Sequence, residues 1–156
     1  MLNRILPAHI DNRYRGHPLG LWLFVPIALM KVSQSLTHLL KHDGGAQSIS
    51  TIPLDTYPAS AAQNVIGLFA RMGLEQLLLA SIFVLVLVRY RALIPLMYLF
   101  IVAHFVGGKI VAQFKPLVLA GTSGVSTPFL IIAILSIVGL ILSLIGRGYE
   151  NQVARP

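Results

Sequence analysis

Residues 128–145 read PFLIIAILSIVGLILSLI, a continuous apolar stretch without a charged side chain. A helix needs about 20 mostly apolar residues to cross the hydrocarbon core of a bilayer, where no water satisfies an exposed backbone. Working outward from this stretch, three further segments of the chain meet the same requirement. The predicted spans are residues 19–40, 64–88, 92–112 and 128–145. The sequence therefore predicts an all-α fold, an integral membrane four-helix bundle that forms a single transmembrane domain over residues 1–156.

The composition of the whole chain agrees with this interpretation. Of its 156 residues, 56% are hydrophobic and 11% are charged, and the mean hydropathy is +0.79. Four spans use most of this length, which leaves no room for a separate soluble catalytic domain. The net charge is +7, but the basic residues flank the spans, so they indicate membrane topology and argue against nucleic acid as a partner. Cysteine is absent, which excludes disulfides and thiolate catalysis.

The basic residues also predict the orientation of the chain. Arginine is concentrated before the first span, between the second and third spans, and after the fourth, as Arg4, Arg13, Arg15, Arg89, Arg91, Arg147 and Arg155. Because positive charge resists translocation, we expect both termini on the cytoplasmic side and the connections at 42–63 and 115–127 outside. The tripeptide ASA at 59–61 resembles a leader-cleavage site, but it lies far behind a long first span, so a retained signal anchor is expected.

Ionisable and amide side chains interrupt three of the four predicted spans. This candidate ligand-binding or polar network contains Lys31, Gln34, His38, Arg71, Glu75, Gln76, His104 and Lys109. A charged group costs about 3 kcal/mol at the centre of a bilayer, so such groups normally face the bundle interior. With a rise of about 1.5 Å per residue, Lys31, Glu75, Gln76 and His104 fall at nearly the same depth, near the middle of the membrane.

Two interpretations of this polar layer remain open. Lys31 and His38 share one helical face and Arg71 and Glu75 share another, so the two faces are expected to meet, with Glu75 pairing with both Arg71 and Lys31. In the first interpretation these contacts only fix the register of the helices. In the second, Lys31, Glu75 and His104 bind a ligand or pass protons. Basic groups outnumber Glu75, so an anionic ligand, a lipid headgroup or a partner carboxylate would complete the balance.

His104 also suggests a cofactor, because an imidazole in an apolar helix is a ligand for haem or chlorophyll. His38 should lie about 10 Å further out, too far to be the second ligand of one haem. One turn beyond His104, Gly107 and Gly108 are expected to let a neighbouring backbone approach closely. The chain has no strong metal-ligand spacing, phosphate loop, GxSxG or HExxH motif, so an enzyme is not favoured and any cofactor stays unknown.

Two segments carry a resemblance to known sequences. NRYRGHP at residues 12–18, which leads into LWLF at 21–24, and VRYRALIPLM at 88–97 look like a group of uncharacterised small proteobacterial inner-membrane proteins. This resemblance covers most of the four spans and implies a four-helix bundle in the bacterial cytoplasmic membrane, without a known activity or catalytic residues. The architecture is also loosely similar, by analogy, to that of DoxX-like four-helix proteins.

The sequence leaves three functional hypotheses. The first is an accessory or structural subunit whose partners are membrane lipids and the helices of a larger membrane complex. The second is a small transporter or ligand-binding protein that uses the Lys, Glu and His layer. The third is a protein that binds a quinone, haem or pigment.

Overall fold

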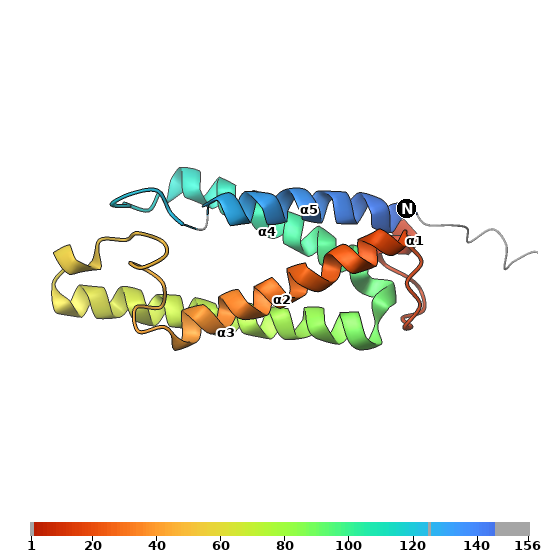
Figure 1. Ribbon diagram of the computed structural model, residues 1–156, viewed down its shortest axis with the longest axis horizontal. Coiled ribbons are helices and arrows are strands. Elements are labelled where there is room, and N and C mark those ends of the chain that lie inside the picture. Colours follow the sequence, from red (N-terminus) through yellow and green to blue (C-terminus); the bar gives the residue numbers. More distant parts are fainter. Residues whose placement is uncertain (1, 125, 146–156) are drawn as a thin grey trace, which may run out of the picture.

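The computed structural model describes residues 2–124 and 126–145, and within these residues every regular element is a helix. In chain order the elements are α1 (Leu2–Ile5), α2 (Pro18–Leu40), η1 (Leu54–Thr56), α3 (Ala59–Arg89), η2 (Arg91–Leu93), α4 (Ile94–Phe114) and α5 (Ser126–Leu144). Helices α2, α3, α4 and α5 are long and apolar enough to cross a membrane. The predicted all-α membrane bundle is thus confirmed, and the chain is a multi-pass membrane protein (Figure 1).

The helix boundaries follow from local sequence signals. The ring of His17 accepts a hydrogen bond from the N–H of Leu19 (3.3 Å), and a proline in the first turn of α2 has no N–H that would need a partner. Helix α3 begins at Ala59, five residues before the predicted start at residue 64, because PAS at 58–60 offers a proline before a run of good helix formers. The predicted cytoplasmic residues Arg147 and Arg155 lie outside the described residues.

The turn that follows α2 is held by Asp43. Its carboxylate accepts hydrogen bonds from the N–H groups of Gly45 (2.9 Å) and Ser48 (2.7 Å). Gly44 and Gly45 both have positive φ, 60° and 77°, a conformation that disfavours any side chain with a Cβ. Partial burial raises the pKa of Asp43, but these hydrogen bonds outweigh it and lower the pKa to about 2.

Helix α2 lies at the centre of the bundle. It packs along α3 on one side and along α5 on the other, and α4 packs mainly on α5. Helices α3 and α4 contact each other little beyond their short connection through η2, since α4 crosses away from α3 toward the opposite end of the molecule (Figure 1). The structure therefore leaves one side of the bundle, between α3 and α4, without tight helix packing.

The best-packed part of the core is aromatic. The ring of Phe24 lies 5.3 Å from Tyr98 and 5.8 Å from Phe83 between centroids, in tilted and edge-on arrangements. The Tyr98 hydroxyl donates a hydrogen bond of 2.7 Å to the carbonyl of Gly20, which satisfies the polar tip of a fully buried side chain. Phe24, Phe83 and Tyr98 thus join α2, α3 and α4 at this level.

Helices α2 and α3 approach each other closely at Gly73. A Cβ at this position would lie 2.7 Å from the Cβ of His38, so only glycine permits this separation. The expectation that Gly107 and Gly108 would admit a neighbouring backbone is wrong, because a Cβ at either position would meet nothing within 4 Å. On α3, the glycine that matters for packing is therefore Gly73, which faces α2.

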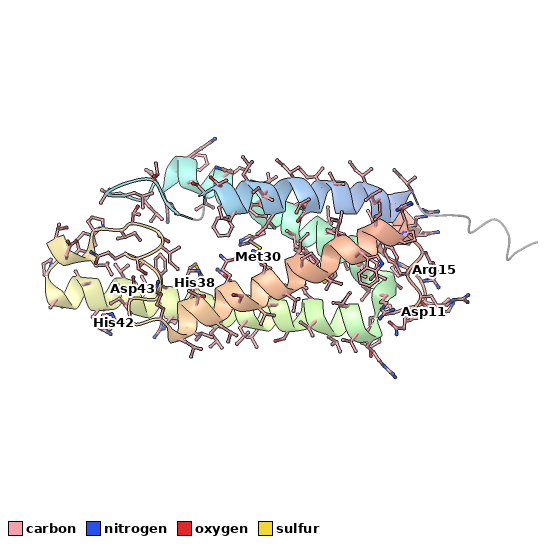
Figure 2. The ribbon with its side chains drawn as sticks, in the orientation of Figure 1. Asp11, Arg15, Met30, His38, His42 and Asp43 are labelled. Atoms are coloured by element: carbon pink, nitrogen blue, oxygen red, sulfur yellow. The ribbon has the colours of Figure 1, made fainter. Side chains whose placement is uncertain are left out.

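The two ends of the bundle are each tied by loop contacts. At one end, Arg4 donates to the last-turn carbonyl of Leu144 (2.5 Å), and the Tyr14 and Ser143 hydroxyls lie 2.8 Å apart. Figure 2 shows Asp11 and Arg15 at this end, where they form an ion pair of 2.6 Å; the Arg15 guanidinium lowers the pKa of Asp11. This end also holds the connection between α3 and α4, as the predicted topology requires.

At the opposite end the two long connections bond to each other. The N–H of Ala120 donates to the carbonyl of Thr51 (2.8 Å), and the N–H of Gly124 donates to the carbonyl of Ile49 (3.1 Å). The Thr51 hydroxyl adds a bond of 2.9 Å to the carbonyl of Gly121. These bonds connect the α2–α3 pair to the α4–α5 pair across the predicted outer face.

Candidate functional site

Lys31 is the most unusual polar residue inside the bundle. It lies on the buried face of α2 and is only 9% exposed. Its ammonium nitrogen lies 5.7 Å from the ring centre of Phe105 and 5.9 Å from that of Phe129. Within the described residues it has no hydrogen-bond acceptor and no carboxylate partner. Contacts with ring faces stabilise the charge by roughly 0.5–2 kcal/mol each, but they leave the three N–H groups without acceptors.

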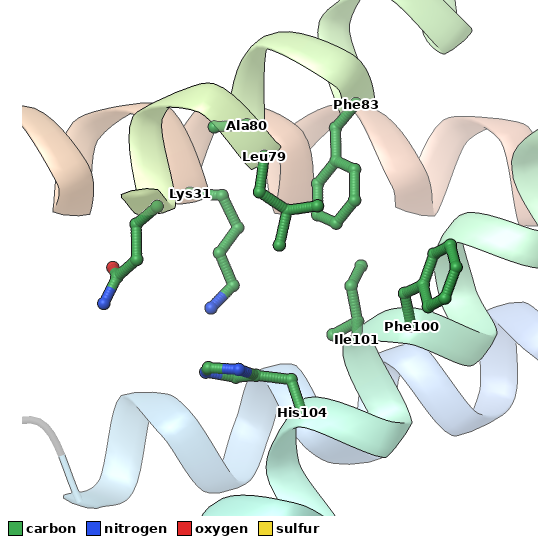
Figure 3. A pocket seen from close by; sticks show the side chains of 8 residues that line it. Lys31, Leu79, Ala80, Phe83, Phe100, Ile101 and His104 are labelled. Atoms are coloured by element: carbon green, nitrogen blue, oxygen red, sulfur yellow. The ribbon is translucent and has the colours of Figure 1, made fainter. Parts of the chain in front are cut away.

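The side chain of Lys31 projects into a small cavity between three helices. Its volume is about 20 Å³, and its walls come from α2, α3 and α4, namely Lys31, Gln76, Leu79, Ala80, Phe83, Phe100, Ile101 and His104. Figure 3 shows the Lys31 ammonium and the His104 ring pointing toward each other across this space. A space of this size holds about one water molecule or one small polar group.

The cavity has a closed floor and an open side. Ala80, Phe83 and Ile101 are each only 1% exposed, so they form the floor. Phe100 is 49% exposed, and Leu79 and His104 are exposed as well, so they form the rim. The rim residues belong to α3 and α4, and these helices contact each other little. The cavity therefore opens sideways, between α3 and α4, toward the lipid.

Gln76 contributes a second unsatisfied polar atom to the same cavity. Its side-chain oxygen is buried and has no hydrogen-bond partner among the residues that the structure describes. A buried acceptor without a donor costs roughly 1–3 kcal/mol. The cavity thus contains a group that only donates hydrogen bonds, Lys31, and a group that needs a donor, Gln76.

The remaining residues of the predicted network do not join this cavity. His38 is buried, donates from Nδ1 to the carbonyl of Gly44 (2.7 Å) and packs edge-on against Phe69, so its contacts anchor the loop that follows α2. Gln34 is half-buried. Arg71, Glu75 and Lys109 are exposed on the outer faces of α3 and α4.

The expected ion pairs of Glu75 with Lys31 and Arg71 are absent from the described residues, where Asp11–Arg15 is the ion pair that the structure shows. Helix geometry explains why Glu75 does not reach Lys31, whereas nothing in the helix geometry prevents a pair between Arg71 and Glu75, which share one face of α3. Successive residues turn by about 100°, so Arg71 and Glu75, two residues on either side of Gly73, both lie about 160° from it. Because Gly73 faces α2, both charged side chains must face away from α2.

His104 does not have the surroundings of a haem or pigment ligand inside the bundle. The cavity beside it is far smaller than the roughly 300 Å³ or more of a typical ligand pocket. Its ring packs edge-on against Phe105, with centroids 6.3 Å apart. Among the described residues there is no cluster of three or more His, Asp or Glu side chains that would hold a metal ion. At the rim of the cavity, the His104 ring is placed to donate or accept a hydrogen bond.

The sequence analysis missed the aromatic residues that surround the Lys31 ammonium. Phe105 comes from α4 and Phe129 from α5, and their rings lie 6.0 Å apart. Phe129 is nearly one hundred positions from Lys31 along the chain, so only the packing of α2 against α5 brings them together. A hint was present in the position of Phe105 directly after His104 at the predicted depth of Lys31.

Comparisons with protein-family models, with curated proteins and with solved structures find no match to this chain. The candidate site therefore rests on its own geometry.

Proposed function

We propose that this chain is a small non-enzymatic subunit of the bacterial cytoplasmic membrane that associates laterally with the helices of another membrane protein. The observation that carries the proposal is the position of Arg71, Glu75 and Lys109. All three lie within membrane-spanning helices, yet all three are exposed on faces that no other element covers within residues 2–124 and 126–145. The location in a bacterial membrane is supported by the resemblance of residues 12–24 and 88–97.

The depth of these charges makes their exposure to lipid costly. Glu75 lies within about 2 Å of the midpoint of α3, and Lys109 lies about 8 Å beyond the midpoint of α4, by the helical rise per residue. A charge at the bilayer centre costs about 2.5–3.5 kcal/mol on insertion scales, and such residues nearly always face protein or water. Because the fold turns these side chains outward, a second protein surface is the partner that would remove this cost.

The outer half of α4 supports the same conclusion. From Gly108 to Phe114 every residue is exposed, so no element among the described residues covers the last two turns of α4. The exposed charges also specify the partner. Two cations, Arg71 and Lys109, flank one anion, so the partner is a transmembrane helix with acidic residues in its outer-leaflet half.

Site-directed photo-crosslinking in intact membranes tests this proposal. A photoreactive residue at Leu78 follows the exposed face of Glu75, and one at Ile110 lies beside Lys109; both positions are exposed. We expect both to give an adduct with the same membrane protein. Ile137 on α5 is similarly exposed and serves as the control, from which we expect no such adduct.

Charge variants make the test specific. Glu75→Gln and Lys109→Met should lower the adduct yield at least fivefold, whereas Asp55→Asn in the exposed loop should leave it unchanged. A strictly monomeric species in mild detergent, with no adduct at residue 78 or 110, would refute the proposal. Equal adducts from all three positions would also refute it, because they would report random encounters in the membrane.

A further inference from the structure

The Lys31 cavity has a hydrogen-bonding requirement that the described part of the chain does not meet. Lys31 is nine-tenths buried as a residue, and its ammonium group points into the cavity (Figure 3) and offers three N–H donors. Phe105 and Phe129 face it with ring carbon, which attracts the charge but does not replace a hydrogen-bond acceptor. The buried oxygen of Gln76 needs a donor in the same space. A matching group must therefore both accept and donate.

The shape of the cavity restricts the rest of the molecule that carries this group. About 20 Å³ admits a polar head and nothing larger. The open side lies between α3 and α4, where Leu79 and Phe100 form an apolar rim. A ligand that fills this site must have a small head and an apolar remainder that stays in the lipid.

The depth of Lys31 excludes the headgroup of a phospholipid. Lys31 lies nine residues before the end of α2, which corresponds to about 14 Å below the outer end of the helix. Lipid phosphates sit outside the hydrocarbon core, at the level of the helix ends. The polar group that reaches Lys31 must be soluble in the hydrocarbon core of the bilayer. A carboxylic acid in its neutral, protonated form meets this requirement.

We propose that this cavity binds the carboxyl group of a lipid-soluble carboxylic acid, of the fatty-acid class. The carbonyl oxygen of the acid accepts a hydrogen bond from the Lys31 ammonium. The acid hydroxyl donates to the free oxygen of Gln76, and the His104 ring closes the rim. The alkyl chain leaves between α3 and α4 into the bilayer. This binding site is additional to the lateral association proposed above, and it uses none of the three exposed charged residues.

Direct binding to the purified chain tests the proposal. The full chain is reconstituted in phosphatidylcholine nanodiscs, and binding of radiolabelled dodecanoic acid is compared with that of methyl dodecanoate. The ester keeps an acceptor oxygen but has no hydroxyl to donate and no ionisable proton. We expect the acid to bind at least tenfold more tightly than the ester.

Variants assign the binding to the cavity. Lys31→Met keeps an unbranched side chain only one atom shorter and should reduce the affinity for the acid at least tenfold. Lys41→Met changes an exposed lysine at the end of the same helix and should alter it by less than twofold. Gln76→Leu should reduce it severalfold, which provides a second route if Lys31→Met does not fold, as judged by gel filtration and helix content.

Equal binding of acid and ester, or unchanged binding in both Lys31→Met and Gln76→Leu, would overturn the proposal. A different result would identify a partner protein as the source of the carboxyl group. In that case dodecanoic acid would not bind the wild-type chain, whereas Lys31→Met would lower the crosslinking yield at residue 78. That result would overturn the lipid-acid site and leave lateral association standing. Conversely, absence of any crosslink would count against lateral association but would not change the comparison between binding of the acid and binding of the ester.

Discussion

The ring of Tyr98 on α4 occupies the space that a side chain at Gly139 on α5 would fill. A Cβ built at residue 139 would come within 2.5 Å of two ring carbons of Tyr98 and of its hydroxyl oxygen. Since Tyr98 is fully buried and its hydroxyl is bonded to Gly20, the ring has no room to move aside. The contact fixes how closely α4 and α5 approach.

Gly139→Ala should therefore destabilise the protein. We expect a loss of about 2–3 kcal/mol, because the added methyl group forces the Tyr98 ring out of its packed position. Thermal unfolding in detergent, followed by circular dichroism, measures this loss. Gly107→Ala is the matched control: its Cβ would enter open space, and alanine favours helix by about 1 kcal/mol, so stability should stay the same or rise. Equal effects of the two substitutions would contradict the packing at Gly139.

Asp43 should make the turn after α2 sensitive to acid. Its pKa is about 2 in the folded protein, below the usual value of 3.8. A carboxyl group with a depressed pKa stabilises the fold fully above its unfolded pKa and loses this effect as the pH falls through the folded pKa. The stabilisation should therefore disappear between about pH 4 and pH 2.

Amide hydrogen exchange at Gly45 and Ser48 measures this change, because both N–H groups bond to the Asp43 carboxylate. Asp43→Asn keeps only one acceptor oxygen and should cost the turn about 1 kcal/mol at neutral pH. It should also remove the acid-dependent increase in exchange. Asp55→Asn, at an exposed position, should leave exchange at Ser48 unchanged; a matching effect there would argue against the role of Asp43.

Lys31→Met should stabilise the purified chain in the absence of added acid. The substitution removes a buried ammonium group whose N–H donors have no acceptor in the described part of the chain, and it keeps an unbranched side chain of similar length. The expected gain is on the order of 2 kcal/mol in free energy of unfolding. Lys41→Met, at an exposed site, should change it by less than about 0.5 kcal/mol. A marked loss of stability in Lys31→Met would show that the ammonium has a partner.

Cysteine labelling should establish the orientation in the membrane. The chain has no cysteine, so a single substitution gives an unambiguous signal. Gln47→Cys, in the connection after α2, should react with a membrane-impermeant maleimide added to intact cells, and Asn12→Cys should react only after the membrane is opened; both positions are exposed. The reverse pattern would invert the predicted topology.

The sequence was sufficient to predict the helices because apolar length and flanking arginines are local signals. The helical rise per residue also predicted that Lys31, Gln76 and His104 lie at the same membrane depth. The structure arranges these three residues around one cavity. Glu75 was expected to share that interior, and it does not. Periodicity aligned it correctly with Arg71, but only the approach of Gly73 to His38 decides which side of α3 faces α2. This contact depends on how α2 and α3 pack together, so it cannot be predicted from the residue pattern of either helix taken separately.

The bonds between the two outer loops have a consequence for anything that visits the interior. Hydrogen bonds of Thr51 and Ala120 join the two long loops at one end of the bundle, and contacts of Arg4 and Tyr14 hold the opposite end. Because these contacts hold both ends of the bundle together, the gap between α3 and α4 is a lateral opening to the cavity. Occupancy of the Lys31 cavity should follow the concentration of a compound in the lipid bilayer. It should depend only indirectly on the concentration of that compound in water.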